Sequence, residues 1–205
     1  ISGGSVSTNG TQLYSGALTL GADTILTASG LTFDDTVDGV FSLTANVSGN
    51  TIFNGNVGET NALTQLVTNA AGATQIGADI TTDGNQTYND AVTLTADAEL
   101  AGNTIEFAST LNGGQELTIT ANGIFQDAVG SGTPLTSLSV SGTSQINGGT
   151  VTTSGTQQYS DETTLGANTT LSGTTVTFGD ILNSDSGMTR NLTVNGAVDF
   201  QDTVG

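Results

Sequence analysis

Apolar and polar residues alternate along most of the chain, in short stretches that end at Gly, Asn, Asp, Ser or Thr. The stretch TYNDAVTLTADAELAGNTIEF, from Thr87 to Phe107, is typical. Alternation of this kind indicates half-buried β-strands, because successive side chains of a strand point to opposite sides. Apolar residues do not keep the i, i+3, i+4, i+7 spacing of an amphipathic helix over several turns. The pattern therefore predicts an all-β protein.

The pattern also recurs along the chain. Three tyrosines are each followed 19 residues later by a phenylalanine: Tyr14 and Phe33, Tyr88 and Phe107, Tyr159 and Phe178. The three tyrosines lie 74 and 71 residues apart, and the apolar positions between each pair agree without insertions or deletions. Self-similarity of this length is typical of repeat architectures. We expect a single segment over residues 1-205, built of units at roughly 1-75, 76-145 and 146-205, with the third unit lacking its final stretch.

A shorter period of about 20 residues lies inside each unit. Bulky residues mark it at Tyr14, Phe33, Phe53 and Ile76, and again at Tyr88, Phe107, Phe125 and Ile146. About 20 residues suffice for three short strands and three turns, which is one coil of a parallel β-helix. The step from Ile76 or Ile146 to the next tyrosine is only 12 or 13 residues. We interpret this step as either a shortened coil or a register shift.

The main alternative is an array of about three β-sandwich modules of 70-odd residues each. The period near 20, the absence of Pro-rich linkers and the absence of Trp all argue against it. The β-helix predicts that the bulky residues point inward and stack in columns, with polar residues at the surface and corners.

Composition narrows the range of partners. The chain has 19 Asp and Glu against a single basic residue, Arg190, and a formal net charge of -18. Nucleic acid is excluded as a partner because binding it needs a basic patch, and anionic membrane surfaces are disfavoured for the same reason. There is no Cys for disulfides or thiol chemistry, and no apolar run is long enough to insert into a membrane. The chain opens in mid-pattern without a signal peptide, and we expect it to be a piece of a longer protein.

Aspartates two residues after the bulky positions are the candidate metal ligands: Asp35, Asp90, Asp127, Asp161, Asp180 and Asp202. If the coils stack, we expect several of these carboxylates along one edge, where a cation such as calcium could lie between them. Gly or Ser interrupts the series at Gly16, Gly55 and Ser109, and the calcium nonapeptide pattern is absent. The competing interpretation is that these aspartates cap turns.

Two other features of the sequence are candidates for a site. A carboxylate pair for glycoside cleavage is conceivable at Asp34 with Asp35, or at Asp127 with its neighbours. A single active site should break the periodicity, however, and these positions lie within the repeat. We therefore expect no catalytic residues and no enzyme activity. Arg190 lies in the sequence SDSGMTRN, where the third unit is longer, and we expect a protruding loop there.

The motifs QxYxxAVTLxADxxLxGxxxxF, FxxxVG, LTSL and VTTxGxQxY together resemble the repeats of large bacterial surface exoproteins of the filamentous-haemagglutinin-like, two-partner-secretion group. The resemblance covers essentially the whole chain. It implies a right-handed parallel β-helix, an extracellular or cell-surface location and an adhesive or structural role. An adhesive role implies receptors or glycans on host or neighbouring cells as partners. Because the open ends of a β-helix need to be covered, we also expect neighbouring repeats or subunits stacked end to end. The resemblance carries no catalytic residues.

Overall fold

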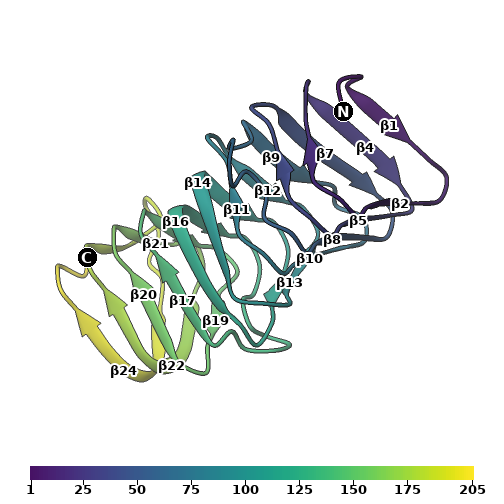
Figure 1. The fold of residues 1–205 in the computed structure, drawn as a ribbon. Helices are drawn as coiled ribbons and strands as arrows, with labels where there is room; N and C mark the ends of the chain where they lie inside the picture. The colour runs from purple at the N-terminus through teal and green to yellow at the C-terminus, as the bar shows by residue number, and fades with distance from the viewer.

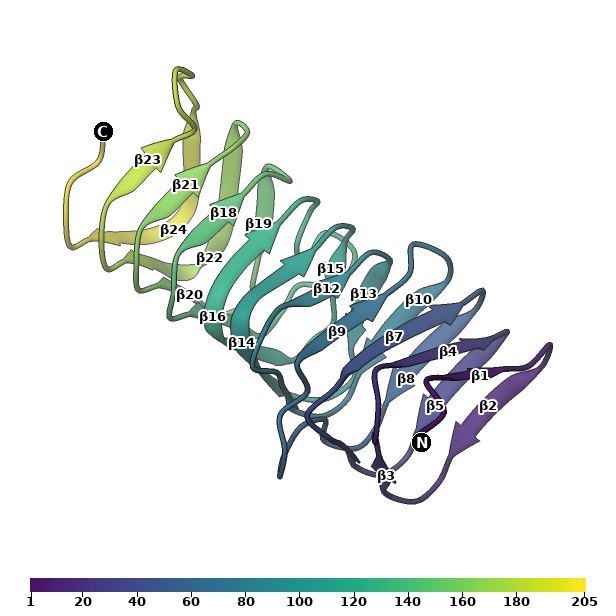
Figure 2. The same cartoon turned by 90° about the horizontal axis from the view of Figure 1, so that it is seen from above.

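The computed structural model describes all residues from 1 to 205 and is a right-handed parallel β-helix of about 10 coils of roughly 19 residues. The coils follow one another along a straight rod from the amino to the carboxyl end (Figures 1 and 2). Every strand pair is parallel, and the chain contains no helix. No segment therefore forms an apolar helix that could cross a membrane. The predicted fold class is confirmed.

Each coil has three faces, which the chain visits in the order face 1, face 2, face 3. Face 1 consists of β2 (Thr11–Tyr14), β5 (Gly30–Phe33), β8 (Asn50–Phe53), β10 (Ala73–Ile76), β13 (Ala91–Leu94), β15 (Leu111–Asn112), β19 (Thr150–Thr152) and the first parts of β22 (Thr169–Phe178) and β24 (Leu192–Phe200).

Face 2 consists of β3 (Leu18–Thr19), β6 (Val37–Asp38), β11 (Ile80–Thr81), β17 (Ser137–Val140), β20 (Thr156–Tyr159), the first parts of β14 (Ala98–Phe107) and β16 (Glu116–Phe125), and the second parts of β22 and β24. Face 3 consists of β1 (Ser5–Ser7), β4 (Thr24–Ala28), β7 (Ser42–Val47), β9 (Gln65–Thr68), β12 (Gln86–Tyr88), β18 (Ser144–Ile146), β21 (Thr163–Leu165), β23 (Leu182–Ser184) and the second parts of β14 and β16. We name the corners edge 1–2, edge 2–3 and edge 3–1.

The longest strands bend around an edge rather than stopping at it. The pairing of β14 with β16 shifts register between Ala101 and Thr104, and that of β22 with β24 shifts between Ser172 and Thr175. Such irregularities bend a strand locally. They let one strand contribute to two faces of the same coil.

The inward side chains form one continuous core of 38 buried residues. The aliphatic positions that follow the aromatic residues stack on one another as the repeat predicts. One column on face 2 runs through Leu18, Val37, Val57, Ile80 and Leu100. A second column, on face 1, runs through Val92, Leu111, Val129 and Val151. Each coil thus covers the apolar side chains of the coils on either side of it.

The aromatic residues form three separate stacks. They are Tyr14–Phe33–Phe53, Tyr88–Phe107–Phe125 and Tyr159–Phe178–Phe200. Neighbouring ring centroids lie 5.2 to 5.8 Å apart and the rings are nearly parallel, with interplanar angles of 3° to 17°. The interpretation of these residues as core ladders is confirmed. Phe200 is 41% exposed because it lies in the last coil.

The three stacks lie on three different faces, because the sequence repeat is not a whole number of coils. Tyr14 lies on face 1, Tyr88 on face 3 and Tyr159 on face 2. From Ile76 on face 1, the chain passes face 2 at Ile80 and reaches Tyr88 on face 3. The short step is therefore a register shift. It shifts each unit to a different face from the one before.

The glycine that ends the FxxxVG motif is required for steric reasons in the first two units. Gly58 and Gly130 have positive φ values of 72° and 68°, and a Cβ at either position would collide with a backbone carbonyl of the next coil, that of Thr81 or Thr152. Only glycine allows both the backbone conformation and the close approach. The motif thus marks a corner where successive coils touch through their backbones.

Two hydroxyl groups inside the core have no hydrogen-bond partner. They belong to Ser144 and Thr163, which face each other in the pairing of β18 with β21. A buried polar group without a partner reduces stability, because it has lost its hydrogen bonds to water. The hydroxyl of Thr169 is similarly buried, but it donates to the carbonyl oxygen of Ala167 at 2.9 Å.

Replacing Thr163 by valine should therefore stabilise the protein, by about 1 kcal/mol. The matched variant, Thr169→Val, loses a satisfied hydrogen bond and should destabilise it by a similar amount. Urea denaturation followed by circular dichroism measures both effects. A fall in the denaturation midpoint for Thr163→Val would contradict this account of the core.

Candidate functional site

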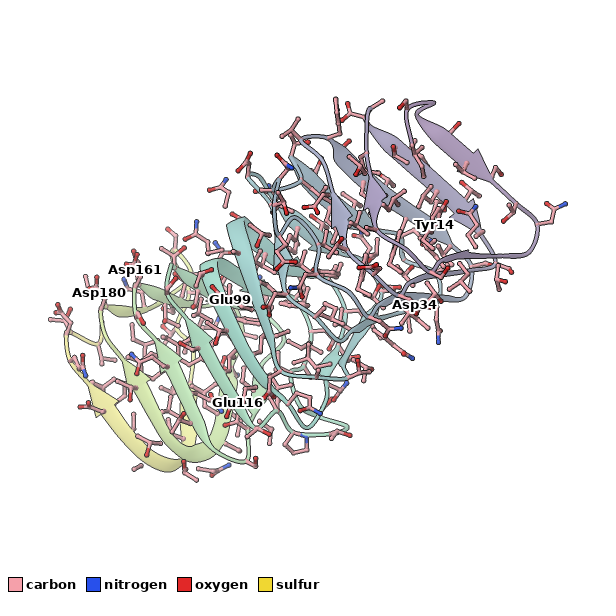
Figure 3. All side chains as sticks on the ribbon, in the orientation of Figure 1. Tyr14, Asp34, Glu99, Glu116, Asp161 and Asp180 are labelled. Atoms are coloured by element: carbon pink, nitrogen blue, oxygen red, sulfur yellow. The ribbon has the colours of Figure 1, made fainter.

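The six candidate aspartates lie on three different edges. Asp35 is on edge 1–2; Asp90 and Asp127 are on edge 3–1; Asp161, Asp180 and Asp202 are on edge 2–3. Asp161, Asp180 and Asp202 lie along one edge, as expected for several of these carboxylates, but the six do not form a single ladder. The physical reason is the register shift between units, which moves equivalent residues to another edge. In Figure 3, Asp161 and Asp180 lie together on one side of the rod, whereas Asp34, beside Asp35 in the sequence, lies on another side.

Five of the six aspartates form the same local hydrogen bond. The Oδ1 atoms of Asp35, Asp127, Asp161, Asp180 and Asp202 accept the backbone N–H of the following residue, at 2.6 to 2.8 Å. An aspartate that bonds to neighbouring backbone in this way stabilises a turn. The contacts therefore favour the turn-capping interpretation for these five residues.

Asp90 behaves differently. Its side chain is only 3% exposed, and Oδ1 accepts hydrogen bonds from the hydroxyls of Thr74, at 2.8 Å, and Thr68, at 3.0 Å. Thr68 and Thr74 flank the wide corner of the preceding coil. Asp90 therefore bonds to both ends of that corner. The two threonines could not be identified as its partners from spacing alone, because they lie 22 and 16 residues earlier in the chain.

Burial raises the pKa of Asp90 above the ordinary aspartate value of 3.8, and the hydrogen bonds from Thr74 and Thr68 lower it in part. Desolvation disfavours the charged carboxylate, which explains the upward direction. The folded chain therefore binds this proton more readily than the unfolded chain does. By linkage, the stability associated with Asp90 is greatest below pH 3.8 and decreases as the pH rises through the folded-state pKa.

In this arrangement the six aspartates do not come together as a metal-binding site. The structure contains no group of three or more carboxylates close enough together to hold a metal ion. Asp161, Asp180 and Asp202 do follow one another on edge 2–3, but each uses Oδ1 to cap its own turn. Calcium binding at the six aspartates stays a prediction.

The carboxylates considered for glycoside cleavage, Asp34 with Asp35 and Asp127, each accept a hydrogen bond from within the protein. Asp34 Oδ1 accepts a hydrogen bond from Nδ2 of Asn54 in the next coil at 2.9 Å, and Asp35 caps its own turn. Asp127, on a different edge from both, caps its own turn through the N–H of Ala128 at 2.7 Å.

A second use of Asp and Asn, which the sequence analysis did not identify, is to bridge neighbouring coils. Asp23, Asp97 and Asn168 occupy the same place in the three units, and each accepts the backbone N–H of a residue in the next coil: Ser42, Glu116 and Asn191, at 2.8 to 3.0 Å. The Ser42 N–H lowers the pKa of Asp23. The signal was present in the sequence as GAD, TAD and GAN, but its partner lies about one coil away.

The VTTxGxQxY motif forms a buried polar cluster. In the second unit, the hydroxyl of Tyr88 donates to Oε1 of Gln86 at 2.8 Å, and Nε2 of Gln86 donates to the carbonyl oxygens of Ile80 and Ala101 at 3.0 and 2.9 Å. The first and third units contain the same cluster around Gln12 with Tyr14 and Gln157 with Tyr159. Burial raises the pKa of Tyr88 and Tyr159. This cluster satisfies the hydroxyl of the tyrosine that begins each aromatic stack.

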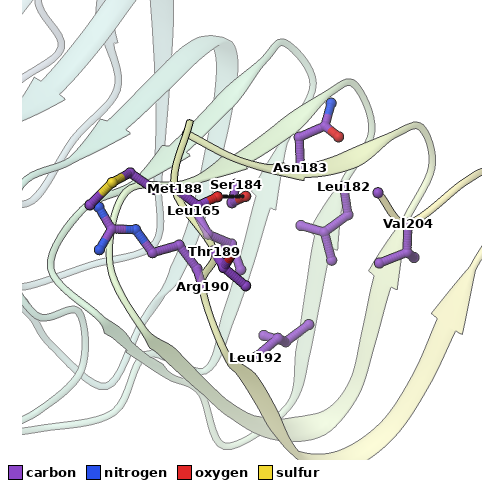
Figure 4. Close-up of a pocket in the computed structure, with 10 residues that line it drawn as sticks. Leu165, Leu182, Asn183, Ser184, Met188, Thr189, Arg190, Leu192 and Val204 are labelled. Atoms are coloured by element: carbon purple, nitrogen blue, oxygen red, sulfur yellow. Dashed lines mark hydrogen bonds between the residues drawn. The ribbon is translucent and has the colours of Figure 1, made fainter. Parts of the chain in front are cut away.

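The long corner of the third unit holds the only salt bridge of the chain. Arg190 donates from Nε and one terminal nitrogen to both carboxylate oxygens of Asp185, at 2.8 and 2.9 Å, and the hydroxyl of Ser184 donates to the carbonyl oxygen of Met188. Arg190 lowers the pKa of Asp185. The corner borders a cavity of about 300 Å³ at the last coil, lined in part by Leu182, Leu192 and Val204 (Figure 4).

Substitutions of Asp180 distinguish turn capping from cation binding, because an amide side chain can still cap the turn but no longer carries the charge that attracts a cation. Asparagine keeps the Oδ1 acceptor and the turn but loses the charge. We expect Asp180→Asn to melt close to the wild type and Asp180→Ala to melt at a lower temperature, with calcium or a chelator making no difference to this order. A melting temperature that rises with calcium in the wild type and not in Asp180→Asn would show a cation site instead.

Asp90→Asn should remove the pH-dependent part of the stability that this carboxyl causes. At neutral pH we expect the variant to be at least as stable as the wild type, and its advantage should shrink as the pH falls toward 3.8. Asp127→Asn, on the same edge but exposed, controls for the loss of one charge. Thermal melts between pH 3.5 and pH 7.5 measure the difference, and parallel pH profiles for both variants would contradict it.

No protein-family model, curated protein or solved structure matches the chain. The resemblance to filamentous-haemagglutinin-like repeats therefore stays a prediction from the sequence motifs.

Proposed function

We propose that the chain is a non-catalytic shaft segment of a large bacterial adhesin or extracellular fibre, secreted or displayed at the cell surface. The observation that carries the proposal is the continuous stacking of about 10 coils on a single core. Of 120 backbone hydrogen bonds, 55 lie outside the strands, and many of these join corners of successive coils. The ladder thus continues around the corners, which favours a stiff rod over a set of jointed modules.

Surface charge supports the same proposal. Acidic residues occur on all three edges, and the one basic residue is already paired with Asp185. Like-charged rods repel one another at distances up to about a Debye length, roughly 8 Å at physiological salt. Repulsion of this kind opposes side-by-side association and leaves the coil ends as the places where further repeats or subunits stack. The proposed outer partners are receptors or glycans on other cells.

Surface display can be tested in the bacterium that encodes the chain. An antibody raised against residues 1-205 should detect the protein on the surface of intact cells or in the culture medium. A broad-specificity protease added outside the cells should remove this signal without lysing them. A cytoplasmic protein provides the matched control for lysis. Labelling that appears only after the cells are made permeable would overturn the proposal.

A further inference from the structure

Equivalent parts of the three units point in three directions around the rod. Between Tyr14 and Tyr88 the chain completes three coils and two of the three faces of a fourth, and it does so again between Tyr88 and Tyr159. Each unit is therefore turned by one face, about a third of a revolution, relative to its neighbour. At ~4.8 Å per coil the accompanying rise is roughly 18 Å.

Independent contacts follow the same rotation. The buried clusters around Gln12, Gln86 and Gln157 form the same hydrogen bonds on face 1, face 3 and face 2. The bridges from Asp23, Asp97 and Asn168 lie on edge 2–3, edge 1–2 and edge 3–1. Core, corner and aromatic stack thus turn together, so the rotation is a property of the whole unit.

We infer that the unit is a screw element that presents any surface feature of the repeat on three sides of the rod. A fourth unit would return to the faces of the first, after about 11 coils or roughly 50 Å. Such a rod suits several separate globular protein partners, each bound to one unit from a different side. It does not suit a partner that lies along one face, because equivalent positions of successive units lie on different faces.

Steric exclusion gives the reason why the rotation matters for binding. Equivalent sites in adjacent coils of one edge lie only ~4.8 Å apart, far less than the width of any folded protein. One bound partner therefore blocks the others on that edge. Sites separated by a third of a revolution and by roughly 18 Å point away from one another, and each remains accessible.

The absence of native cysteine allows a direct count on the full chain. One variant carries Asp35→Cys, Ser109→Cys and Asp180→Cys, which are equivalent positions two residues after the phenylalanine of each unit. The matched control carries Asp161→Cys, Asp180→Cys and Asp202→Cys, which lie in successive coils of edge 2–3. Both are labelled with biotin–maleimide and saturated with monovalent streptavidin, and light scattering with native mass spectrometry gives the bound number.

We expect three streptavidin molecules on the first variant and one on the control. Circular dichroism checks that both variants keep the β fold, and the extent of biotin labelling is measured before binding. Equal numbers on the two fully labelled, folded variants would overturn the inference. The count does not depend on where the chain is located in the cell, so its outcome is independent of the proposed surface display.

Discussion

The parallel hydrogen-bond ladder between successive coils is the interaction on which the rest of the structure depends. It requires each inward residue to lie directly over its counterpart in the previous coil, as Val57 lies between Val37 and Ile80. Side chains of similar size must therefore recur at each coil, which produces the apolar and aromatic columns. Length differences between coils are absorbed at the corners. The long corner at Arg190 and the wide corner between Thr68 and Thr74 are examples.

Polar side chains inside the rod are mostly buried together with a hydrogen-bond partner. The tyrosine that starts each aromatic stack would bury a hydroxyl without a partner if the glutamine two residues earlier did not accept from it. Asp90 is buried at a corner only because two threonine hydroxyls donate to it. Ser144 occupies the place in the second unit that Thr74 has in the first, yet it lacks such an acceptor. The equivalent of Asp90 in the third unit, Asp161, points outward and caps its own turn.

The corners also explain why the chain uses so many Asp and Asn residues. Where the backbone leaves the strand conformation, some N–H groups lose their partner in the adjacent coil. Carboxylate or amide oxygens then accept these N–H groups, either from the next residue, as at Asp35, or from the next coil, as at Asp23. Much of the negative charge of the protein thus has a structural origin. The same charge discourages the rods from associating side by side.

The sequence alone determined the class of fold, the inward positions and the aromatic columns, because alternation and period report side-chain direction and coil length directly. It also identified the short step before Tyr88 and Tyr159 as a shortened coil or a register shift, without choosing between them. Only the tertiary structure decided that it is a register shift, and hence that the candidate aspartates occupy three edges. It also placed Thr68 and Thr74 against Asp90, and Ser42 against Asp23. The physical reason is that these contacts join residues about one coil apart, so that a difference of a few residues at one corner changes which side chains meet.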